Sequence, residues 1–338
     1  MTSLLSVKGL KQHFVMGGGL LQKKYTVYAV DGISFDLKQG ETLGLVGESG
    51  CGKSTLGRSL LKLFEPTAGQ ICFEGRDITA LSAREMRSLR QEMQIVFQDP
   101  AESLNGRHTV GQILEEPFII HGKGSRSERQ LWVRELLGKV GLPETAADRF
   151  PHEFSGGQRQ RIGIARAIAL KPKLLVCDEA VSALDVSVQS QIVNLLLTLQ
   201  REMNLGLIFI AHDLSVVKHI SDRIAVMYLG RIVEIAPAQQ LYRNPRHPYT
   251  QALISAIPVP DPRRRNQRIL LTGDVPSPIS PPPGCHFHQR CPHAGERCRS
   301  QSPQLEPCAG EAHQVACHFP LPQEAPTQAA VITLGKAI

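Results

Sequence analysis

Apolar and polar residues follow two different periods along the chain. Alternation in Leu4–Val7 and Ile33–Leu37 predicts edge strands, and the run Thr42–Val46 predicts a buried strand. A helix is expected from about residue 53 to 64, and Val186–Met203 carries apolar residues at helical spacing. Further buried strands are predicted at Ile95–Phe97, Leu174–Cys177 and Leu207–Ile210. Strands alternating with helices predict an α/β fold with a mostly parallel sheet, an antiparallel β edge, and ligands at the carboxyl ends of the parallel strands.

Two segments break this alternation. Residues from about 99 to 160 lack strand-like runs and contain helical patterns such as Arg129–Val140, so we expect a helical insertion in the α/β core. Eight prolines lie between Pro258 and Pro283, which predicts an extended connector with poor helix and strand potential, leading to a cysteine-rich end. We therefore expect an α/β domain at residues 1–257, a C-terminal extension at 258–320 and a flexible tail at 321–338.

Composition and charge narrow the function only slightly. The 338 residues are 42% hydrophobic and 20% charged, which is sufficient for a buried core. The N-terminal residues lack a signal-peptide pattern, and no apolar run reaches the roughly 18 residues of a membrane helix, so we expect a chain that neither spans nor crosses a membrane. The 38 Lys and Arg against 31 Asp and Glu give a formal charge of +7, which suits nucleic acid, an anionic membrane or a nucleotide.

A glycine-rich loop follows the expected strand Thr42–Val46. Its residues Gly47–Ser54 read G-E-S-G-C-G-K-S, which fits the phosphate-loop pattern G-x-x-x-x-G-K-[ST]. The glycines allow backbone N–H groups to point at phosphate oxygens, and the N-terminus of the following helix favours an anion. Lys53 is expected to reach the β- and γ-phosphates, and Ser54 to bind Mg²⁺. A simple glycine-rich turn is disfavoured by the flanking strand and helix.

Two acidic residues end the expected strand Leu174–Cys177. Asp178 is expected to hold Mg²⁺ through water, and Glu179 to polarise the attacking water. An Asp-Glu pair after a strand is by itself more often a solvated strand end, but the upstream phosphate loop favours the catalytic role. Together the two motifs predict an ATPase, a GTPase or a kinase.

The segment Phe154–Arg161 separates these classes. It contains Ser155, Gly156, Gly157 and Gln158 at the start of an expected helix, and here the sequence resembles the ABC ATPases, whose signature is Ser-Gly-Gly-Gln. The resemblance implies that this helix N-terminus donates N–H groups to the γ-phosphate of a nucleotide held by a partner subunit. It therefore implies a dimer in which each ATP site draws residues from two subunits.

The resemblance also assigns roles outside these motifs. Gln98 corresponds to the glutamine that senses Mg²⁺ and the attacking water, and that couples the site to the helical insertion. His212 matches the switch histidine that contacts the γ-phosphate. Asp185 ends the segment Ser182–Asp185, which resembles the loop that crosses the dimer interface.

An aromatic residue before the phosphate loop is expected to stack on adenine. Phe14 aligns best with this position, and Tyr25 and Tyr28 are alternatives. The resemblance implies further nucleotide contacts from Asp178 and from the phosphate loop with the residue after it. These loop residues are Gly47, Glu48, Ser49, Gly50, Cys51, Gly52, Lys53, Ser54 and Thr55.

Other segments narrow the resemblance to bacterial peptide importers. Residues 244–250, Asn-Pro-Arg-His-Pro-Tyr-Thr, and the tail after them are similar to ATP-binding subunits of dipeptide and oligopeptide transporters, the DppF type. The resemblance implies a peripheral chain on the cytoplasmic face of the inner membrane, paired with a second, different ABC ATPase. Its other implied partners are two transmembrane permease subunits and a periplasmic peptide-binding protein. ATP hydrolysis would energise import of dipeptides or short peptides, and no nucleic acid is expected.

Other functions stay open from the sequence. A soluble ABC ATPase acting on nucleic acid or ribosomes suits the charge, but such proteins typically have tandem ATPase halves or a long coiled-coil insertion. A regulatory module that holds ATP without hydrolysing it is disfavoured by the presence of Glu179 and His212. Related importers carry haem precursors or nickel chelates, which the sequence does not distinguish from peptides.

The eight cysteines are unevenly distributed, and five lie in the last fifth of the chain. In a cytosolic chain such clustering favours metal over disulfides. Cys285, Cys291, Cys298 and Cys317 resemble the tail of peptide-importer ATPases that can carry a [4Fe-4S] cluster, and tetrahedral zinc is the alternative. Cys308 is a spare candidate ligand, and nearby histidines are others. A structural role is expected rather than a redox one.

Overall fold

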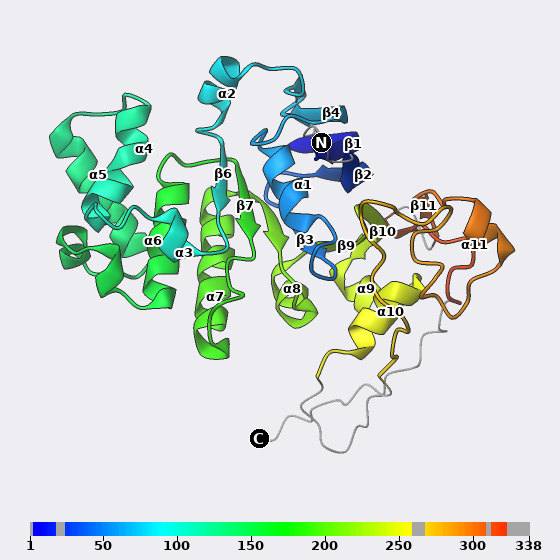
Figure 1. Cartoon of the computed structure of the whole chain (residues 1–338). Helices are drawn as coiled ribbons and strands as arrows, with labels where there is room; N and C mark the ends of the chain where they lie inside the picture. Colours follow the sequence, from blue (N-terminus) through cyan, green and yellow to red (C-terminus); the bar gives the residue numbers. More distant parts are fainter. Residues whose placement is uncertain (1–2, 18–23, 259–267, 309–311, 323–338) are drawn as a thin grey trace, which may run out of the picture.

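The structure is a computed structural model that describes residues 3–17, 24–258, 268–308 and 312–322. Two β-sheets and their covering helices make up the body, and the C-terminal extension lies beside it (Figure 1). The expectations for residues 259–267 of the proline-rich connector and for residues 323–338 of the tail fall outside the described ranges.

The larger sheet runs through the centre of the described chain in the order β11-β12-β10-β9-β3-β8-β7-β6. The strands from β9 to β6 are parallel, whereas β10, β11 and β12 pair in antiparallel fashion. The strand bounds are β3 Thr42–Val46, β6 Met93–Val96, β7 Leu174–Asp178, β8 Gly206–Ile210, β9 Arg223–Tyr228, β10 Arg231–Pro237, β11 Glu306–Pro307 and β12 Gln314–Val315. The expected mostly parallel α/β sheet is confirmed.

A second, antiparallel sheet in the order β2-β1-β4-β5 forms the expected β edge. Its strands are β1 Leu5–Met16, β2 Tyr25–Leu37, β4 Ala68–Phe73 and β5 Arg76–Asp77. The short alternating runs in the sequence marked only parts of β1 and β2, because both strands continue into more polar residues at the exposed end of the hairpin.

Both faces of the central sheet are buried. Along β7, Leu174 and Val176 pack into the core shared with α1 and the antiparallel sheet, whereas Leu175 and Cys177 pack into the core shared with α6 and α7. A strand buried on both faces has a continuous apolar sequence, which explains why the runs at β3, β7 and β8 are uninterrupted. The helices around these strands are α1 Lys53–Leu60, α2 Ala83–Leu89, α6 Gly156–Ile168, α7 Val186–Met203 and α8 Leu214–Ile220.

The expected helical insertion lies between β6 and β7 and extends to the left in Figure 1. Side chains of Thr109 and Ser125 cap its two longer helices, each in a reciprocal capping box with the residue three positions later. The insertion comprises α3 Pro100–Ser103, α4 Val110–Ile120, α5 Arg126–Lys139 and the 3₁₀ turns η1 Glu144–Asp148 and η2 Pro151–Glu153.

The C-terminal extension adds two short strands to the body. Two short strands, β11 and β12, join the central sheet, with β12 pairing antiparallel with β10. The expectation of poor helix and strand potential concerned the connector between Pro258 and Pro283, and its described residues 268–283 contain no helix or strand. β11 and β12 lie beyond the connector and are stabilised by pairing with an existing strand. The helix in the extension is α11 Glu296–Ser300, and α9 Ala238–Arg243 and α10 Pro248–Ser255 precede the extension.

A buried carboxylate joins the extension to the body. Glu234 on β10 is fully buried and accepts hydrogen bonds from the backbone N–H groups of Arg246 (2.7 Å) and His247 (2.9 Å). The Nε2 atom of His313 lies 2.7 Å from the same carboxylate. Three segments distant in sequence thus meet at one carboxylate.

The burial of His247 predicts a pH dependence of stability. Burial lowers the pKa of His247 to about 4, although Glu234 opposes the shift, so the folded chain holds this ring neutral. The unfolded ring titrates near pH 6.5, hence the stability is fully present above that pH and falls as the pH drops towards 4. We expect a loss of about 2 kcal/mol at pH 5 relative to pH 7.5 in urea denaturation.

The matched variant is His247→Asn. Nδ1 of His247 accepts the backbone N–H of Tyr249, and an asparagine oxygen can accept a bond with the same spacing. If this variant loses stability between pH 7.5 and 5 as much as the wild type does, another group causes the effect.

Candidate active site

Four functional segments meet at one edge of the central sheet. The order β3-β8-β7-β6 places the carboxyl ends of these parallel strands side by side. The phosphate loop follows β3, and His212 follows β8. Asp178 ends β7 with Glu179 directly after it, and Gln98 follows β6. The structure therefore brings together the residues that the sequence places apart, as expected for an open parallel sheet.

The phosphate loop is folded tightly around its own lysine. The buried Nζ of Lys53 donates hydrogen bonds to the carbonyl oxygens of Gly47 at 2.8 Å and Glu48 at 3.0 Å. Gly52 has a φ of +103°, and a Cβ there would lie 2.0 Å from the carbonyl oxygen of Ala29. Only glycine fits that position, so the loop has the close approach and left-handed backbone for which its glycines are needed.

Asp178 lies within hydrogen-bond distance of the phosphate-loop serine. Ser54 Oγ donates to Asp178 Oδ1 at 2.6 Å, and Arg58 Nη2 lies 3.6 Å from Oδ2. Asp178 is fully buried, and its Oδ2 has no hydrogen-bond partner among the residues that the structure describes. A buried carboxylate oxygen without a hydrogen bond, next to a serine hydroxyl, provides the hard oxygen ligands that Mg²⁺ prefers. The residues present therefore fit the expected cation.

Glu179 is held in an unusual backbone conformation beside Gln98. Gln98 Nε2 donates to Glu179 Oε2 at 2.9 Å, which joins the ends of β6 and β7 through side chains. Glu179 has a φ of +48°, a value uncommon for a residue with a side chain, and its N–H donates to the carbonyl of Ile210 on β8. Such strain concentrates at functional sites.

A cleft of about 590 Å³ opens beside this pair. It is lined by Arg58, Gln98 and Ser182 among others, so it lies between the phosphate-loop helix α1, the end of β6 and the segment after β7. His212 is exposed and begins the connection from β8 to α8. The cleft provides space for a reacting group next to Gln98.

Arg58 lines the cleft and lies near Asp178, but it belongs to none of the sequence motifs. It lies on α1, four residues after Ser54, and therefore on the same face of the helix. The spacing of four residues from Ser54 was the sequence feature that could have indicated Arg58, but most arginines on helices have no role in a site.

The signature segment Ser155–Gln158 lies at the N-terminus of α6 and not beside the phosphate loop (Figure 1). Ser155 caps α6, accepting the N–H of Gln158, and Ser155, Gly156 and Gln158 are exposed. Figure 1 shows α6 separated from α1 by β6 and β7. Asp185 similarly caps α7 by accepting the N–H of Val188 at 2.9 Å, and it is exposed. The helix N-terminus with its open N–H groups thus faces solvent in the single chain.

The three candidate adenine-stacking residues share one hairpin. Phe14 lies near the end of β1 and contacts Phe64 edge to face, with ring centroids 5.3 Å apart. Tyr25 and Tyr28 lie on the paired strand β2, opposite Met16 and His13. The fold keeps all three in the same region.

A substitution series separates these candidates. We expect Phe14→Ala to weaken ATP binding by roughly tenfold, because base stacking on an aromatic ring contributes about 1–3 kcal/mol. Tyr25→Ala and Tyr28→Ala serve as matched controls with little expected effect. Titration with a fluorescent ATP analogue gives the three dissociation constants, and a loss confined to either tyrosine would reassign the role.

The C-terminal cysteines divide into two neighbourhoods. Burial, together with the charges of Cys285, Cys291 and Cys298, raises the pKa of Cys317 to about 12, so these four thiols lie within electrostatic range of one another. Burial also raises the pKa of Cys308, but its charged neighbours are Arg246 and Glu234. Within the described ranges, no group of three or more His, Cys, Asp or Glu side chains is arranged to hold a metal ion, so the expected metal site is not supported by the fold.

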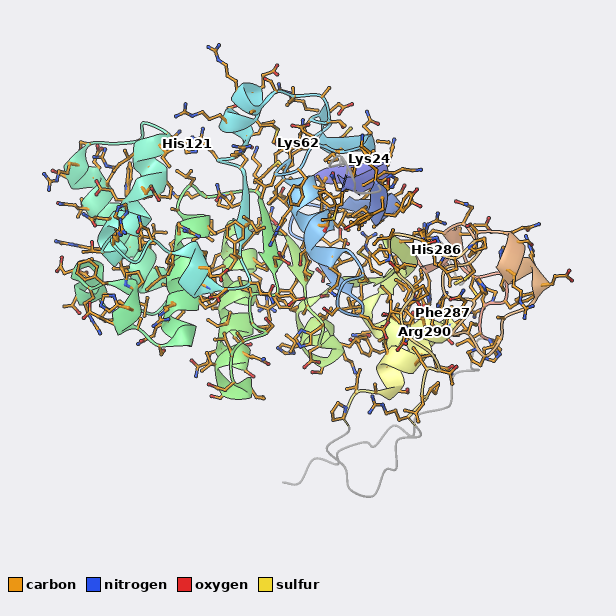
Figure 2. The ribbon with its side chains drawn as sticks, viewed as in Figure 1. Lys24, Lys62, His121, His286, Phe287 and Arg290 are labelled. Atoms are coloured by element: carbon orange, nitrogen blue, oxygen red, sulfur yellow. The ribbon has the colours of Figure 1, made fainter. Side chains whose placement is uncertain are left out.

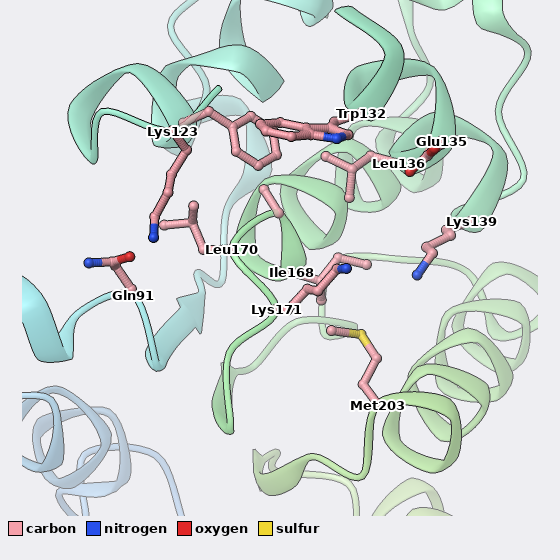
Figure 3. Close-up of a pocket in the computed structure, with 12 residues that line it drawn as sticks. Gln91, Lys123, Trp132, Glu135, Leu136, Lys139, Ile168, Leu170, Lys171 and Met203 are labelled. Carbon is pink, nitrogen blue, oxygen red and sulfur yellow. The ribbon is translucent and has the colours of Figure 1, made fainter. Parts of the chain in front are cut away.

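A separate cavity of about 310 Å³ lies away from the phosphate loop (Figure 3). Trp132, Leu136 and Met203 contribute to its apolar lining, and Lys123 and Lys139 lie at opposite sides of it. It is bordered by α5 and the ends of α6 and α7, and none of the expected ATP-site residues lines it. It is therefore not part of the site described above.

The fold and these contacts define a P-loop ATPase of the ABC class. Comparison with protein families supports this assignment: residues 30–182 match the family described as ABC transporter, and residues 233–298 match the oligopeptide/dipeptide transporter C-terminal region. The chain is 54% identical to the oligopeptide transport ATP-binding protein AppF of Bacillus subtilis, over 94% of this chain and 97% of that protein. It is 52% identical to the probable peptide ABC transporter ATP-binding protein y4tS of Sinorhizobium fredii, over 99% and 96% of the two chains.

The chain belongs to the ATP-binding subunits of the oligopeptide/dipeptide family of ABC transporters. Its activity is therefore ATP hydrolysis, with ATP and Mg²⁺ as the expected ligands of the phosphate loop.

Solved structures of ABC cassettes have the same core. The chain is similar to cbiO1 of Clostridium perfringens with a TM-score of 0.62 and 28% identity, covering 72% of this chain and 91% of that one. The cassette MJ0796, solved as a dimer after hydrolysis with ADP and Pi bound, gives the same TM-score and identity over 69% and 98% of the two chains. None of the helices in the described ranges is both long and apolar enough to cross a membrane.

Proposed function

We propose that this chain energises the import of dipeptides or other short peptides through an ABC transporter. The observation that carries the proposal is the end-to-end similarity to peptide-transport ATP-binding proteins, which includes the C-terminal region as well as the cassette. Action on nucleic acid or ribosomes has no comparable support. Import of haem precursors or nickel chelates is the alternative within the same transporter class.

The proposed roles follow from the geometry of the cleft. When ATP binds, the Nζ of Lys53 exchanges its two backbone carbonyl partners for phosphate oxygens. Ser54, Asp178 and Gln98 would hold Mg²⁺, which neutralises charge on the phosphates. Glu179 accepts a proton from the attacking water and Gln98 orients it, while His212 donates a hydrogen bond to the γ-phosphate.

Each ATP site is proposed to be completed by a second subunit. The exposed N-terminus of α6, with Ser155, Gly156, Gly157 and Gln158, would contact the nucleotide of a partner ATPase, and Asp185 would lie in the interface. We infer that the partner is a different ABC ATPase.

The membrane partners are proposed to be two permease subunits, served by a periplasmic peptide-binding protein. The exposed Ile119 and Ile120 at the end of α4 support a contact surface on the helical insertion, since large exposed apolar neighbours are uncommon on a free surface. The chain would therefore be peripheral, on the cytoplasmic face of the inner membrane. We propose that residues 1–257 carry the ATPase, 258–320 form the extension and 321–338 the tail.

Affinity purification in mild detergent tests this proposal. The chain isolated from its own membranes should retain two multi-span permeases and a second ABC ATPase, identified by mass spectrometry. Recovery of ribosomal or DNA-repair proteins without a permease would leave the ATPase standing and overturn the transport function. The accompanying binding protein would distinguish peptides from haem precursors and nickel chelates.

The four neighbouring thiols are proposed to hold a [4Fe-4S] cluster, with zinc as the alternative. Support comes from their shared neighbourhood: Cys285, Cys291 and Cys298 all contribute to the raised pKa of Cys317, whereas Cys308 has other neighbours. Cys298 is buried and the other three are partly buried. Four neighbouring thiolates repel one another, so their ionisation would require a cation that compensates their charge. Adjustment of the side chains would be needed to form the ligand set.

Metal analysis of the anaerobically purified full chain checks this prediction. We expect about four iron atoms and four acid-labile sulfides per chain, or one zinc, in wild type and Cys308→Ser. Cys317→Ser should lose most of the metal. Wild-type chain without iron or zinc, or loss of metal in the Cys308 variant alone, would show that the proposed ligand set is wrong.

A further inference from the structure

The C-terminal extension reaches the phosphate loop through one arginine. Arg290 donates two hydrogen bonds to the carboxylate of Glu48, from Nη1 to Oε2 at 2.7 Å and from Nη2 to Oε1 at 3.1 Å. The arginine side chain is only 8% exposed. Two-point pairing of this kind fixes direction as well as distance, and a buried guanidinium is screened less than one on the surface.

The backbone of Glu48 is held from two further directions. Its N–H donates to the hydroxyl of Tyr249 on α10 at 2.9 Å, and its carbonyl accepts from Lys53 Nζ at 3.0 Å. The second residue of the phosphate loop therefore has its side chain, its N–H and its carbonyl all engaged. Two of these three contacts come from residues beyond the ATPase motifs.

An aromatic cluster holds the two contacting groups in place. Tyr228, Tyr249 and Phe287 are fully buried, and their ring centroids lie 4.8 to 5.3 Å apart. The guanidinium carbon of Arg290 lies 5.9 Å from the ring centroid of Tyr228. Figure 2 labels Phe287 and Arg290 beside α10. Packed edge-to-face rings have few alternative arrangements, so the arginine and the tyrosine hydroxyl present fixed partners to the loop.

We propose that Arg290 of the C-terminal extension and Tyr249 on α10 are positioning residues, which together hold the phosphate loop in its ATP-binding conformation. The loop contains Gly47, Gly50 and Gly52, all at positive φ, and glycine loses the most conformational entropy when a loop is ordered. Anchoring Glu48 in the ATP-free chain removes part of that loss from the binding step, which increases affinity.

The coupling acts in both directions. If the extension increases ATP affinity, bound ATP must stabilise the extension by the same factor. Residues 285–298 contain Arg290, which lies between Cys285 and Cys291. A change in their packing would therefore alter the affinity for ATP, although Arg290 and Glu48 are 242 residues apart in sequence.

Titration of the full-length chain with a fluorescent ATP analogue tests the proposal. We expect Arg290→Ala to weaken binding about tenfold, and Arg290→Lys to fall between it and the wild type, because lysine cannot pair with both carboxylate oxygens. Glu48→Gln should show a similar loss. The double variant Glu48→Gln with Arg290→Ala should be no weaker than either single variant, since both remove one interaction.

Two controls separate this effect from general destabilisation. Arg129 forms a comparable pair with Glu115 at 2.7 Å in the helical insertion, so Arg129→Ala should leave ATP affinity unchanged. The proposal rests on ATP binding at the phosphate loop, and Lys53→Ala tests that step alone. If Lys53→Ala abolishes binding while Arg290→Ala binds ATP as tightly as the wild type, only the positioning role is overturned.

Hydrogen exchange provides a second readout. Bound ATP should slow amide exchange in residues 285–298 more in the wild type than in Arg290→Lys. Arg290→Lys is the variant to use if Arg290→Ala does not fold. Equal protection in the wild type and Arg290→Lys, or additive losses of affinity in the double variant, would contradict coupling through this pair.

Discussion

Replacement of Glu179 by glutamine should lower ATP turnover by about 10²–10⁴-fold while ATP still binds. The magnitude is that of a general base, because an amide cannot accept a proton from the attacking water. Glu179 Oε2 lies 2.9 Å from Nε2 of Gln98, which lines the cleft, and the backbone N–H of Glu179 donates to the carbonyl of Ile210. The change is nearly isosteric, so the fold should persist.

The measurement is phosphate release from the assembled transporter, with nucleotide affinity determined in parallel. Glu144→Gln is the matched control, because Glu144 is an exposed carboxylate in the helical insertion that pairs with the exposed Arg134 at 3.7 Å. Unchanged turnover in Glu179→Gln would show that another group takes the proton. A loss of turnover together with a loss of ATP binding would indicate a structural effect instead.

The parts of this site that could be predicted from sequence are local. The loop Gly47–Ser54 and the pair Asp178 and Glu179 each follow a continuous apolar strand, and parallel topology then dictates that they share one edge of the sheet. Residue spacing alone was sufficient to predict the roles of those residues, because the backbone of one short segment fixes where each functional group lies.

The contacts that Arg290 and Tyr249 make with the phosphate loop could not be predicted in this way. The pair of Glu48 and Arg290 spans 242 residues, and no local pattern indicates which arginine meets a given carboxylate. Residues 244–250 resembled a transporter family in sequence, but only the fold shows that Tyr249 in this segment bonds the phosphate loop. Likewise, spacing left Cys308 and Cys317 as rivals, and tertiary structure separates their neighbourhoods.

Glu234→Ala is expected to destabilise the extension by about 3–5 kcal/mol. The substitution leaves the N–H groups of Arg246 and His247 and the ring of His313 without their shared acceptor in a buried setting. Because Glu234 also lies in β10 opposite Val315, the loss should detach β12 from the central sheet. Urea denaturation and hydrogen exchange over residues 312–316 would measure both effects.

Glu234→Gln is the graded variant, since it keeps one carbonyl oxygen and loses the charge, and its destabilisation should be smaller. The surface pair of Lys173 and Glu74, at 2.7 Å and nearly half exposed, supplies the control Glu74→Ala with little effect. If Glu234→Ala unfolds at the same urea concentration as that control, the buried carboxylate does not hold the extension. In that case the aromatic packing around Phe287 would be sufficient to anchor it.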